Sequence, residues 1–312
     1  MNKLRLISTA VVLAGLTLGT TAMAQSTWNV YSGSSNGSGC TQNGANTGTF
    51  NNSWACTSAT GGTAGTSMTV SAWSSDRNVS GNANYLSGSG YASAHMSSQG
   101  NSGFGAASRL EGIGVSSPDH SFDSIAPGTI DLMLLDFGTT SVILDKIGIG
   151  WTNGDADITV MRWTGSTAPG KPTGTTSTGG NQNLVDTAYN PATPAVAGWQ
   201  LVGSYADLAT DSSLPFGANA RSTGTSLSSS WWLISTFNQA LNGGSTNCLK
   251  SDGTTTTCGA GNDSFKLNYI ATKLGGGGGG GGGSVPEPTS LALAAMALVG
   301  LMGARRRGNQ QA

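Results

Sequence analysis

The sequence predicts an all-β fold, an antiparallel β-sandwich of jelly-roll type with a loop-rich N-terminal part. At least six short runs are rich in β-branched and aromatic residues, and apolar and polar side chains alternate within them as in a strand. Turn-forming Gly, Ser, Asn and Thr separate these runs, and the 49 glycines are about twice the usual ~7%. The sequence contains no convincing amphipathic helix and no repeat of about 20 to 50 residues, which argues against a solenoid or a propeller.

The first 24 residues have the features of a cleavable secretory signal peptide. A basic start precedes the apolar residues 6–18, and Ala22 and Ala24 form an A-x-A cleavage site before Gln25. The apolar stretch is short for a transmembrane helix, and the small residues after it favour cleavage. We therefore expect export, with removal of the leader by signal peptidase.

The body that follows, residues 25–274, is long enough for one large β domain or two small ones. From Gln25 to Ser284 the chain has 9 basic and 14 acidic side chains, a formal charge of −5, which argues against a nucleic-acid partner. Charged residues are only 9% of the chain, where about 25% is usual. A surface of hydroxyl and amide groups suits an extracellular β protein better than a cytosolic enzyme.

The four cysteines form two local pairs, Cys40 with Cys56 and Cys248 with Cys258. Export places them in an oxidising compartment, so we expect disulfides, and proximity favours these two pairs among the three possible connectivities. A metal site is disfavoured because the C-x-x-C spacing and nearby histidines are both missing.

The strands are expected in a definite order along the body. Residues 25–112 are rich in Gly, Ser and Asn, with short strands such as 67–73, and much of this part is expected to form loops around the core. Residues 113–274 carry the core strands. These are 129–137, 141–151, 155–163, 199–205, 230–237 and 263–270.

Asn153 and Gly154 predict a hairpin between the second and third of these strands. A type I′ turn needs positive φ at both central residues, which Asn and Gly adopt readily.

The C-terminal segment is organised differently from the body. Nine consecutive glycines, 275–283, form with Ser284 a flexible tether before Val285-Pro286-Glu287-Pro288. Residues 289–304 are almost wholly apolar and predict a short membrane helix. The strictly apolar part would reach about 21 Å, against a bilayer core of roughly 30 Å. Arg305-Arg306-Arg307 then favours the cytoplasmic side, which leaves the Pro-Glu-Pro segment at the outer face.

This order of features resembles the PEP-CTERM sorting signal of exosortase-processed proteins. An ordinary C-terminal anchor that contains Pro-Glu-Pro is the alternative. The body is also similar to exosortase-dependent surface proteins of Gram-negative bacteria at 153–163, 198–205, 231–235 and 263–267. The resemblance implies export through the Sec translocon, transient anchoring in the inner membrane, and recognition of Pro286-Glu287-Pro288 by exosortase. It further implies release to the cell surface or to an extracellular polysaccharide matrix.

The body offers little that looks catalytic. Three patterns lack the context that an active site requires: Asp119-His120-Ser121, the G-x-S-x-G match at 33–37, and Gly148-Ile149-Gly150. Glu111 is the only glutamate in the body, so glycosidase chemistry would have to use aspartates. Asp131, Asp136 and Asp145 are available, and no spacing singles them out. We therefore predict no catalytic residues and no enzyme.

Two kinds of binding site remain as candidates. Asn153, Asp155 and Asp157 have the spacing of calcium ligands, although Ile158 stands where a calcium loop has glycine and no later glutamate fits. Calcium is therefore only a possible cofactor here. Adjacent residues of a strand point to opposite faces, so one of Trp231 and Trp232 is a candidate for stacking on a sugar ring. The other tryptophans are expected in the core.

These observations predict an exported, non-enzymatic surface protein associated with a biofilm or exopolysaccharide matrix. A carbohydrate-binding adhesin is the alternative, and a secreted hydrolase is less favoured because His and Glu are so scarce.

Overall fold

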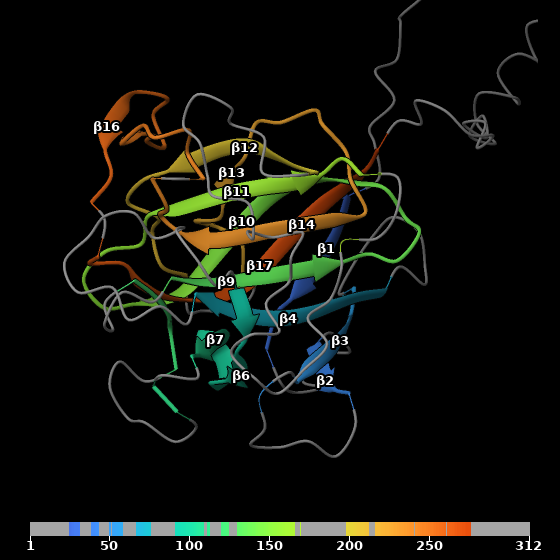
Figure 1. Cartoon of the computed structure of the whole chain (residues 1–312). Coiled ribbons are helices and arrows are strands. Elements are labelled where there is room, and N and C mark those ends of the chain that lie inside the picture. The colour runs from blue at the N-terminus through green and yellow to red at the C-terminus, as the bar shows by residue number, and fades with distance from the viewer. Residues whose placement is uncertain are drawn as a thin grey trace, which may run out of the picture. The chain divides into compact units, whose positions relative to one another are not determined.

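The computed structural model divides the chain into two units, Met1–Gly275 and Gly276–Ala312 (Figure 1). The residues that it describes all belong to the first unit. They are 25–31, 39–43, 50, 52–58, 67–75, 91–108, 111–112, 120–124, 130–165, 169, 198–211, 216–239, 241–259 and 261–275. The predicted signal peptide and the predicted membrane helix 289–304 lie outside these residues. Among the described residues no helix is long and apolar enough to cross a membrane.

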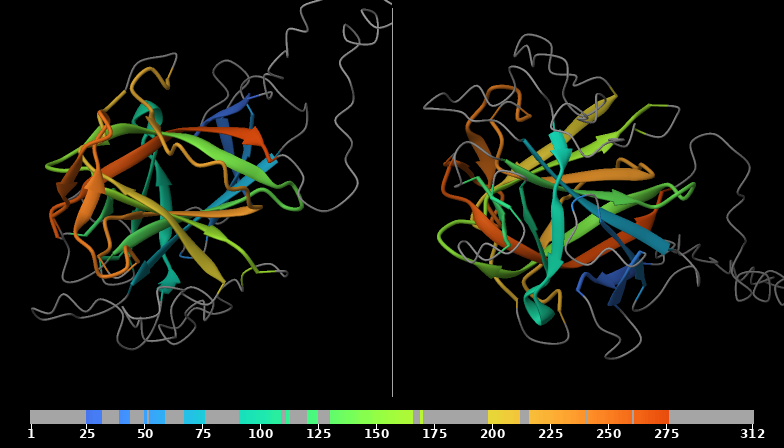
Figure 2. Two further views of the ribbon diagram at one scale, coloured as in Figure 1. Left: turned by 90° about the horizontal axis from the view of Figure 1, so that it is seen from above. Right: turned by 60° about the horizontal axis from the view of Figure 1, so that its bottom comes forward.

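The described residues form two β-sheets, so the predicted all-β class is confirmed (Figures 1 and 2). The seven-stranded sheet contains β1 (Gln25–Asn29), β6 (His95–Ser98), β7 (Phe104–Ala107), β8 (Phe122–Asp123), β10 (Val142–Thr152), β13 (Arg221–Ser222) and β17 (Ser264–Leu274). The ten-stranded sheet contains β2 (Gly39–Gln42), β3 (Ser53–Thr57), β4 (Ser67–Ser75), β5 (Tyr91–Ser93), β9 (Asp131–Asp136), β11 (Ile158–Trp163), β12 (Trp199–Tyr205), β14 (Trp231–Thr236), β15 (Asn247–Leu249) and β16 (Thr255–Thr257). A single 3₁₀ turn, η1 (Gly100–Ser102), joins β6 and β7 within this region.

Strand order shows that distant parts of the chain pair. The larger sheet runs β16-β15-β12-β11-β14-β9-β4-β3-β2, and the smaller runs β13-β10-β17-β7-β6. Among the described strands, pairing is antiparallel except between β12 and β15. Strand β17 is central, since it pairs with β1, β10, β7 and β8 and is buried along nine of its eleven residues. Its buried residues include the polar side chains of Ser264, Lys266, Asn268 and Thr272 beside the apolar Phe265, Leu267 and Ile270 of the main core.

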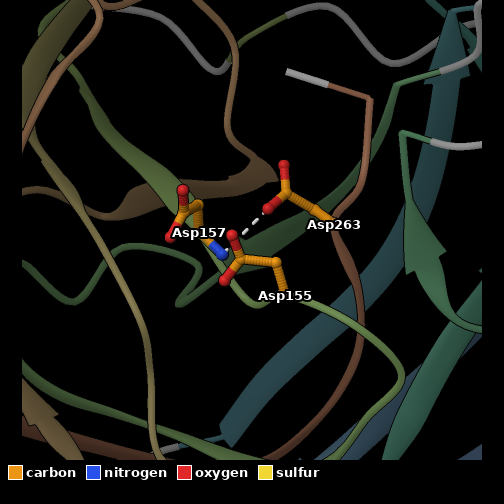
Figure 3. A group of neighbouring side chains, drawn as sticks. All are labelled: Asp155, Asp157 and Asp263. Carbon is orange, nitrogen blue, oxygen red and sulfur yellow. Dashed lines mark hydrogen bonds between the residues drawn. The ribbon is translucent and has the colours of Figure 1, made fainter. Parts of the chain in front are cut away.

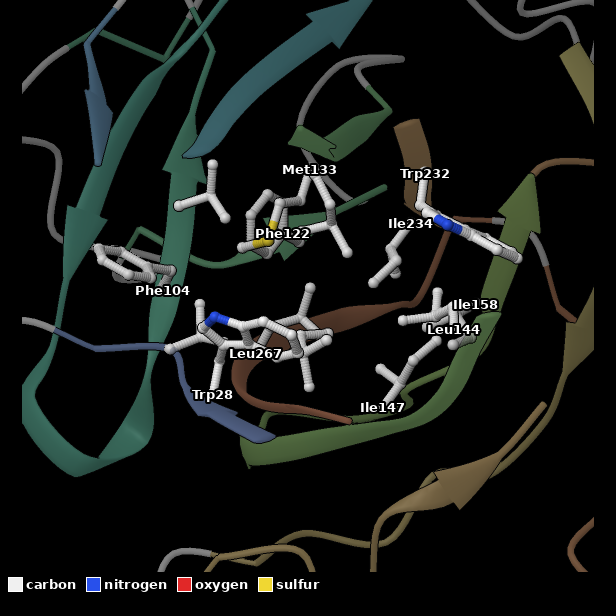
Figure 4. Close-up of a cluster of buried hydrophobic side chains, with 14 of the residues drawn as sticks. Trp28, Phe104, Phe122, Met133, Leu144, Ile147, Ile158, Trp232, Ile234 and Leu267 are labelled. Carbon is white, nitrogen blue, oxygen red and sulfur yellow. The ribbon is translucent and has the colours of Figure 1, made fainter. Parts of the chain in front are cut away.

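The main hydrophobic core lies between the two sheets (Figure 4). Trp28 and Leu267 of the smaller sheet are fully buried, as are Ile158, Trp232 and Ile234 of the larger one. Burying each of these side chains contributes roughly 1.5–3 kcal/mol or more by removing apolar area from water. This core therefore joins strands from the first and last parts of the body.

A second cluster covers the opposite face of the larger sheet. Leu233 lies between Trp232 and Ile234 in β14 and belongs to this second cluster, as the period of two requires. Trp73, Trp163 and Trp199 belong to it as well. The larger sheet is thus apolar on both faces.

The predicted hairpin at Asn153 and Gly154 was wrong. Strand β10 pairs with β13 and β17 in the smaller sheet, whereas β11 pairs with β12 and β14 in the larger one. Gly154 has a φ of 88°, but Asn153 is not among the described residues with positive φ, so a type I′ turn does not form. Instead Asn153 N–H donates to the Ser264 carbonyl, and the chain crosses from one sheet to the other.

The described residues within 25–112, the part that the sequence predicts to be rich in loops, take part in both sheets. They contribute seven strands, β1 to β7, to both sheets. Trp28, Met68, Val70 and Phe104 are all fully buried in the core. Single large apolar residues among Gly and Ser therefore suffice to anchor these strands.

Both expected disulfides are present, Cys40–Cys56 and Cys248–Cys258. The first joins directly paired residues of β2 and β3, at one edge of the larger sheet. The second links β15 to the residue after β16, at the other edge. Edge strands are paired on one side only, so cross-linking them compensates for the missing neighbour.

Candidate functional site

Three aspartates that are far apart in the sequence meet at one end of the sheets (Figure 3). Asp155 and Asp157 lie in the crossing from β10 to β11, and Asp263 immediately precedes β17. One carboxylate oxygen from each lies within 4.8 Å of the other two. Asp157 and Asp263 are buried, and Asp155 is half-buried.

Backbone pairing holds this cluster together. Asp155 and Asp263 form a parallel β-bridge, and Ser264 N–H donates to the Asp155 carbonyl over 3.0 Å. Asp157 N–H donates to Asp263 Oδ1 over 3.0 Å, which is the bond drawn in Figure 3. The second oxygen of Asp263 accepts from the Ser124 hydroxyl over 3.3 Å, and Asp157 Oδ1 accepts from Asp207 N–H over 2.9 Å.

Burial dominates the electrostatics of the cluster. It raises the pKa of Asp263 from 3.8 to about 8, and the negative charges of Asp157 and Asp155 add to this effect. Burial likewise raises the pKa of Asp157 to about 6, with smaller contributions from Asp155 and Asp207. The Asp263 carboxyl therefore retains its proton near neutral pH unless a positive charge compensates it.

Three carboxylate oxygens at this spacing are the kind of donor that a hard cation such as Ca²⁺ prefers. The sequence pattern identified two of them, Asp155 and Asp157. Its third candidate, Asn153, instead contributes its backbone N–H to β17. Asp263 was missed because it lies 106 residues from Asp157, and the only hint was its position at the start of a predicted strand.

The three aspartates considered for glycosidase chemistry have separate surroundings. Asp131 is fully buried, and its pKa is raised well above the usual range by burial and by the charges of Asp123 and Glu111. Asp136 accepts from Gly138 N–H in a turn over 2.8 Å. Asp145 belongs to the other sheet, where it accepts from Gln25 and Lys273. The fold therefore gives each of the three its own partners.

The two histidines, His95 and His120, pack against each other. The rings of His95 and His120 lie edge to face with their centroids 6.2 Å apart. The Ser121 hydroxyl is 2.8 Å from that of Ser264, and Asp119 lies outside the described residues. The neighbours of His120 in sequence are thus not assembled with it as a catalytic group in the described part of the chain.

Trp231 and Trp232 point to opposite faces, as expected for adjacent residues in a strand. Trp232 is fully buried in the main core, and its indole N–H donates to the Ser229 carbonyl over 3.1 Å. Trp231 is half-buried beside the second cluster. There the rings of Trp163 and Trp199 lie 5.3 Å apart. Of the two candidates, Trp231 alone has an accessible surface.

The C-terminal segment supplies the comparison that decides the sorting route. The model of the PEP-CTERM protein-sorting motif matches residues 284–307. The chain carries a PEP-CTERM sorting signal. The match includes Pro286-Glu287-Pro288 and the three arginines 305–307. The PEP-CTERM signal identifies exosortase as the processing partner and the cell envelope or surface as the destination. No curated protein and no solved structure matches the chain.

Of the other residues predicted to take part in processing, Gln25 alone belongs to the described part of the chain. Ala22, Ala24 and the PEP-CTERM residues Val285 to Pro288 lie outside the described residues. Gln25 is described and is the first residue of β1.

Proposed function

We propose that this exported surface protein is a non-enzymatic component of a biofilm or exopolysaccharide matrix, with the β body as the cargo of the sorting signal. The PEP-CTERM match at 284–307 is the observation that carries the proposal. In this scheme the leader directs the chain to the Sec translocon. The apolar helix holds the precursor briefly in the inner membrane, and exosortase then acts at Pro286-Glu287-Pro288.

The character of the body supports a structural role. Disulfides cross-link the strands at both edges of the larger sheet, which suits a protein that stays folded in the oxidising conditions outside the cell. The cluster of Asp155, Asp157 and Asp263 is largely buried, and Asp157 and Asp263 already accept hydrogen bonds from the backbone. Such groups are better suited to holding segments together than to meeting a substrate.

The proposal is tested by changing the sorting signal in cells that contain exosortase. With Pro286→Ala and Glu287→Ala combined, we expect a full-length precursor that stays in the membrane fraction. Gly279→Ala in the tether is the matched control and should be processed normally. Mass spectrometry of the surface-exposed form should show that the arginine tail is missing from the wild-type protein. Unchanged processing of the double variant would contradict the proposed sorting, and a body that alone hydrolyses matrix polysaccharide would contradict the non-enzymatic role.

A carbohydrate-binding adhesin is the second candidate, because Trp231 is only half-buried and lies beside other tryptophans. An exposed indole can stack on a sugar ring. Trp231→Ala should then abolish binding of the body to matrix polysaccharide while lowering the free energy of unfolding by only about 1 kcal/mol. Absence of binding by the wild-type body to any matrix polysaccharide would eliminate this candidate.

A further inference from the structure

One carboxylate joins the two ends of the β body. Asp145 Oδ2 accepts from the Gln25 side-chain amide over 2.9 Å, and Asp145 Oδ1 accepts from Lys273 Nζ over 2.7 Å. Gln25 is also directly paired with Lys273 in the register of β1 and β17. Asp145, Gln25 and Lys273 together form a clasp between the two ends of the body.

A β-bulge places Asp145 in this position. The register between β10 and β17 shifts between Leu144 and Lys146, so Asp145 has no direct partner in β17. A bulge redirects a side chain relative to its neighbours. Only 13% of the Asp145 side chain is exposed, which strengthens its charge-assisted bonds.

Gln25 is also the residue that becomes the N-terminus if signal peptidase cuts after Ala24. An N-terminal glutamine can cyclise without a co-reactant. The neutral α-amine nitrogen attacks Cδ of its own side chain, the Cδ–Nε2 bond breaks, and an amine proton leaves with Nε2 as ammonia. The product is a five-membered lactam that has lost both the free α-amine and the Nε2 donor.

The clasp opposes this reaction geometrically. Nε2, the atom that must leave, is bonded to Asp145, and the backbone of Gln25 is aligned against Lys273. Cyclisation needs the side chain to fold back onto its own α-nitrogen, which requires breaking the hydrogen bond from the Gln25 side-chain amide to Asp145 first. We propose that the clasp keeps the mature N-terminus as open-chain glutamine, an assignment that rests on the proposed export and cleavage.

The experiment is peptide mass spectrometry of the N-terminus of the protein released from cells. The purified protein is incubated at pH 8, where an α-amine is about half neutral, and loss of ammonia is followed over time. Wild-type protein should cyclise slowly when folded and at the ordinary peptide rate in urea. Asp145→Ala should raise the folded-state rate by at least about tenfold, the lower end of the factor expected for one hydrogen bond to a charged group.

Three variants separate the clasp from general stability. Asp145→Asn retains an acceptor oxygen for the Gln25 amide and should keep most of the protection. Lys273→Met removes the ion pair but not the Gln25 bond and should have little effect. Ile147→Val, in the same strand and buried in the core, reports the effect of destabilisation alone.

Two results would overturn the proposal: wild-type protein that is already cyclised on isolation, or equal rates in Asp145→Ala and Ile147→Val. A mature chain that begins at another residue would overturn it as well, because Gln25 would then have no free α-amine. Neither of the first two results affects the proposed function, whose own test is the processing of the Pro286 and Glu287 variant.

Discussion

Replacing Asp263 should change how the stability of the body depends on pH. The folded-state pKa of Asp263 is about 8, against an ordinary value of 3.8, because the carboxyl is buried beside other carboxylates. Between these two values the unfolded chain has released a proton that the folded chain still holds. The free energy of unfolding therefore falls as pH rises from about 4 to about 8 and levels off above that. Asp263→Asn cannot ionise, so its curve should be flatter.

The structure sets the size of the effect. At 1.36 kcal/mol per pH unit, the interval from 3.8 to about 8 corresponds to at most about 6 kcal/mol. The bonds from Asp157 N–H and the Ser124 hydroxyl favour the ionised form and are included in that pKa. Relaxation and water entry on ionisation reduce it further, so we expect a loss of about 2–3 kcal/mol between pH 4.5 and 8. Asparagine keeps the acceptor for Asp157 N–H, cannot ionise, and places an amide NH2 group where Asp263 Oδ2 accepts from the Ser124 hydroxyl.

The assay is urea unfolding followed by tryptophan fluorescence at pH 4.5, 6 and 8, with a chelator present. Between pH 4.5 and 8 the free energy of unfolding should fall by about 2–3 kcal/mol more in the wild-type protein than in Asp263→Asn. Asp136→Asn is the matched control, because the Asp136 side chain accepts an exposed hydrogen bond from Gly138 N–H in a turn. Its free energy of unfolding should depend on pH as that of the wild type does. Parallel curves for the wild type and Asp263→Asn would refute the reasoning. Repeating the series with calcium tests whether a cation compensates the cluster, since stability at pH 8 should then rise in the wild type alone.

Three further predictions concern stability. Trp232→Ala should destabilise the body by about 3–5 kcal/mol in urea unfolding, because it empties a fully buried site, whereas Trp231→Ala should cost about 1 kcal/mol; equal costs would contradict the assigned faces. Replacing Cys248 and Cys258 by serine should lower stability by about 2–3 kcal/mol, measured against the wild type with and without reductant; a loss that persists when both proteins are reduced would argue against the cross-link as its cause. Gly198→Ala should cost more than about 1 kcal/mol, since the backbone φ is 82° and a Cβ would meet the Trp163 ring; an unchanged midpoint would show that the ring moves aside.

The sequence predicted the strands better than their partners. The expected run 199–205 coincides with β12, and 230–237 and 263–270 contain most of β14 and β17. The apolar and aromatic residues of these strands are a local signal that a short window captures. Strands near the N-terminus, such as β1, were missed because only Trp28 is a large apolar residue there and its burial depends on distant neighbours.

The segment from Asn153 to Asp157 shows why neither the pairing of β10 and β11 nor the full acidic cluster could be predicted from the sequence. Asn-Gly is compatible with a tight hairpin, and Gly154 does adopt positive φ. What overrides the hairpin is β17, whose Ser264 both accepts from Asn153 and donates to Asp155. That same contact brings Asp263 to Asp155 and Asp157, so the failed hairpin and the missed aspartate have one cause. The sorting signal did not share this difficulty, because the order of its features is contained in about 25 consecutive residues and depends on no distant partner.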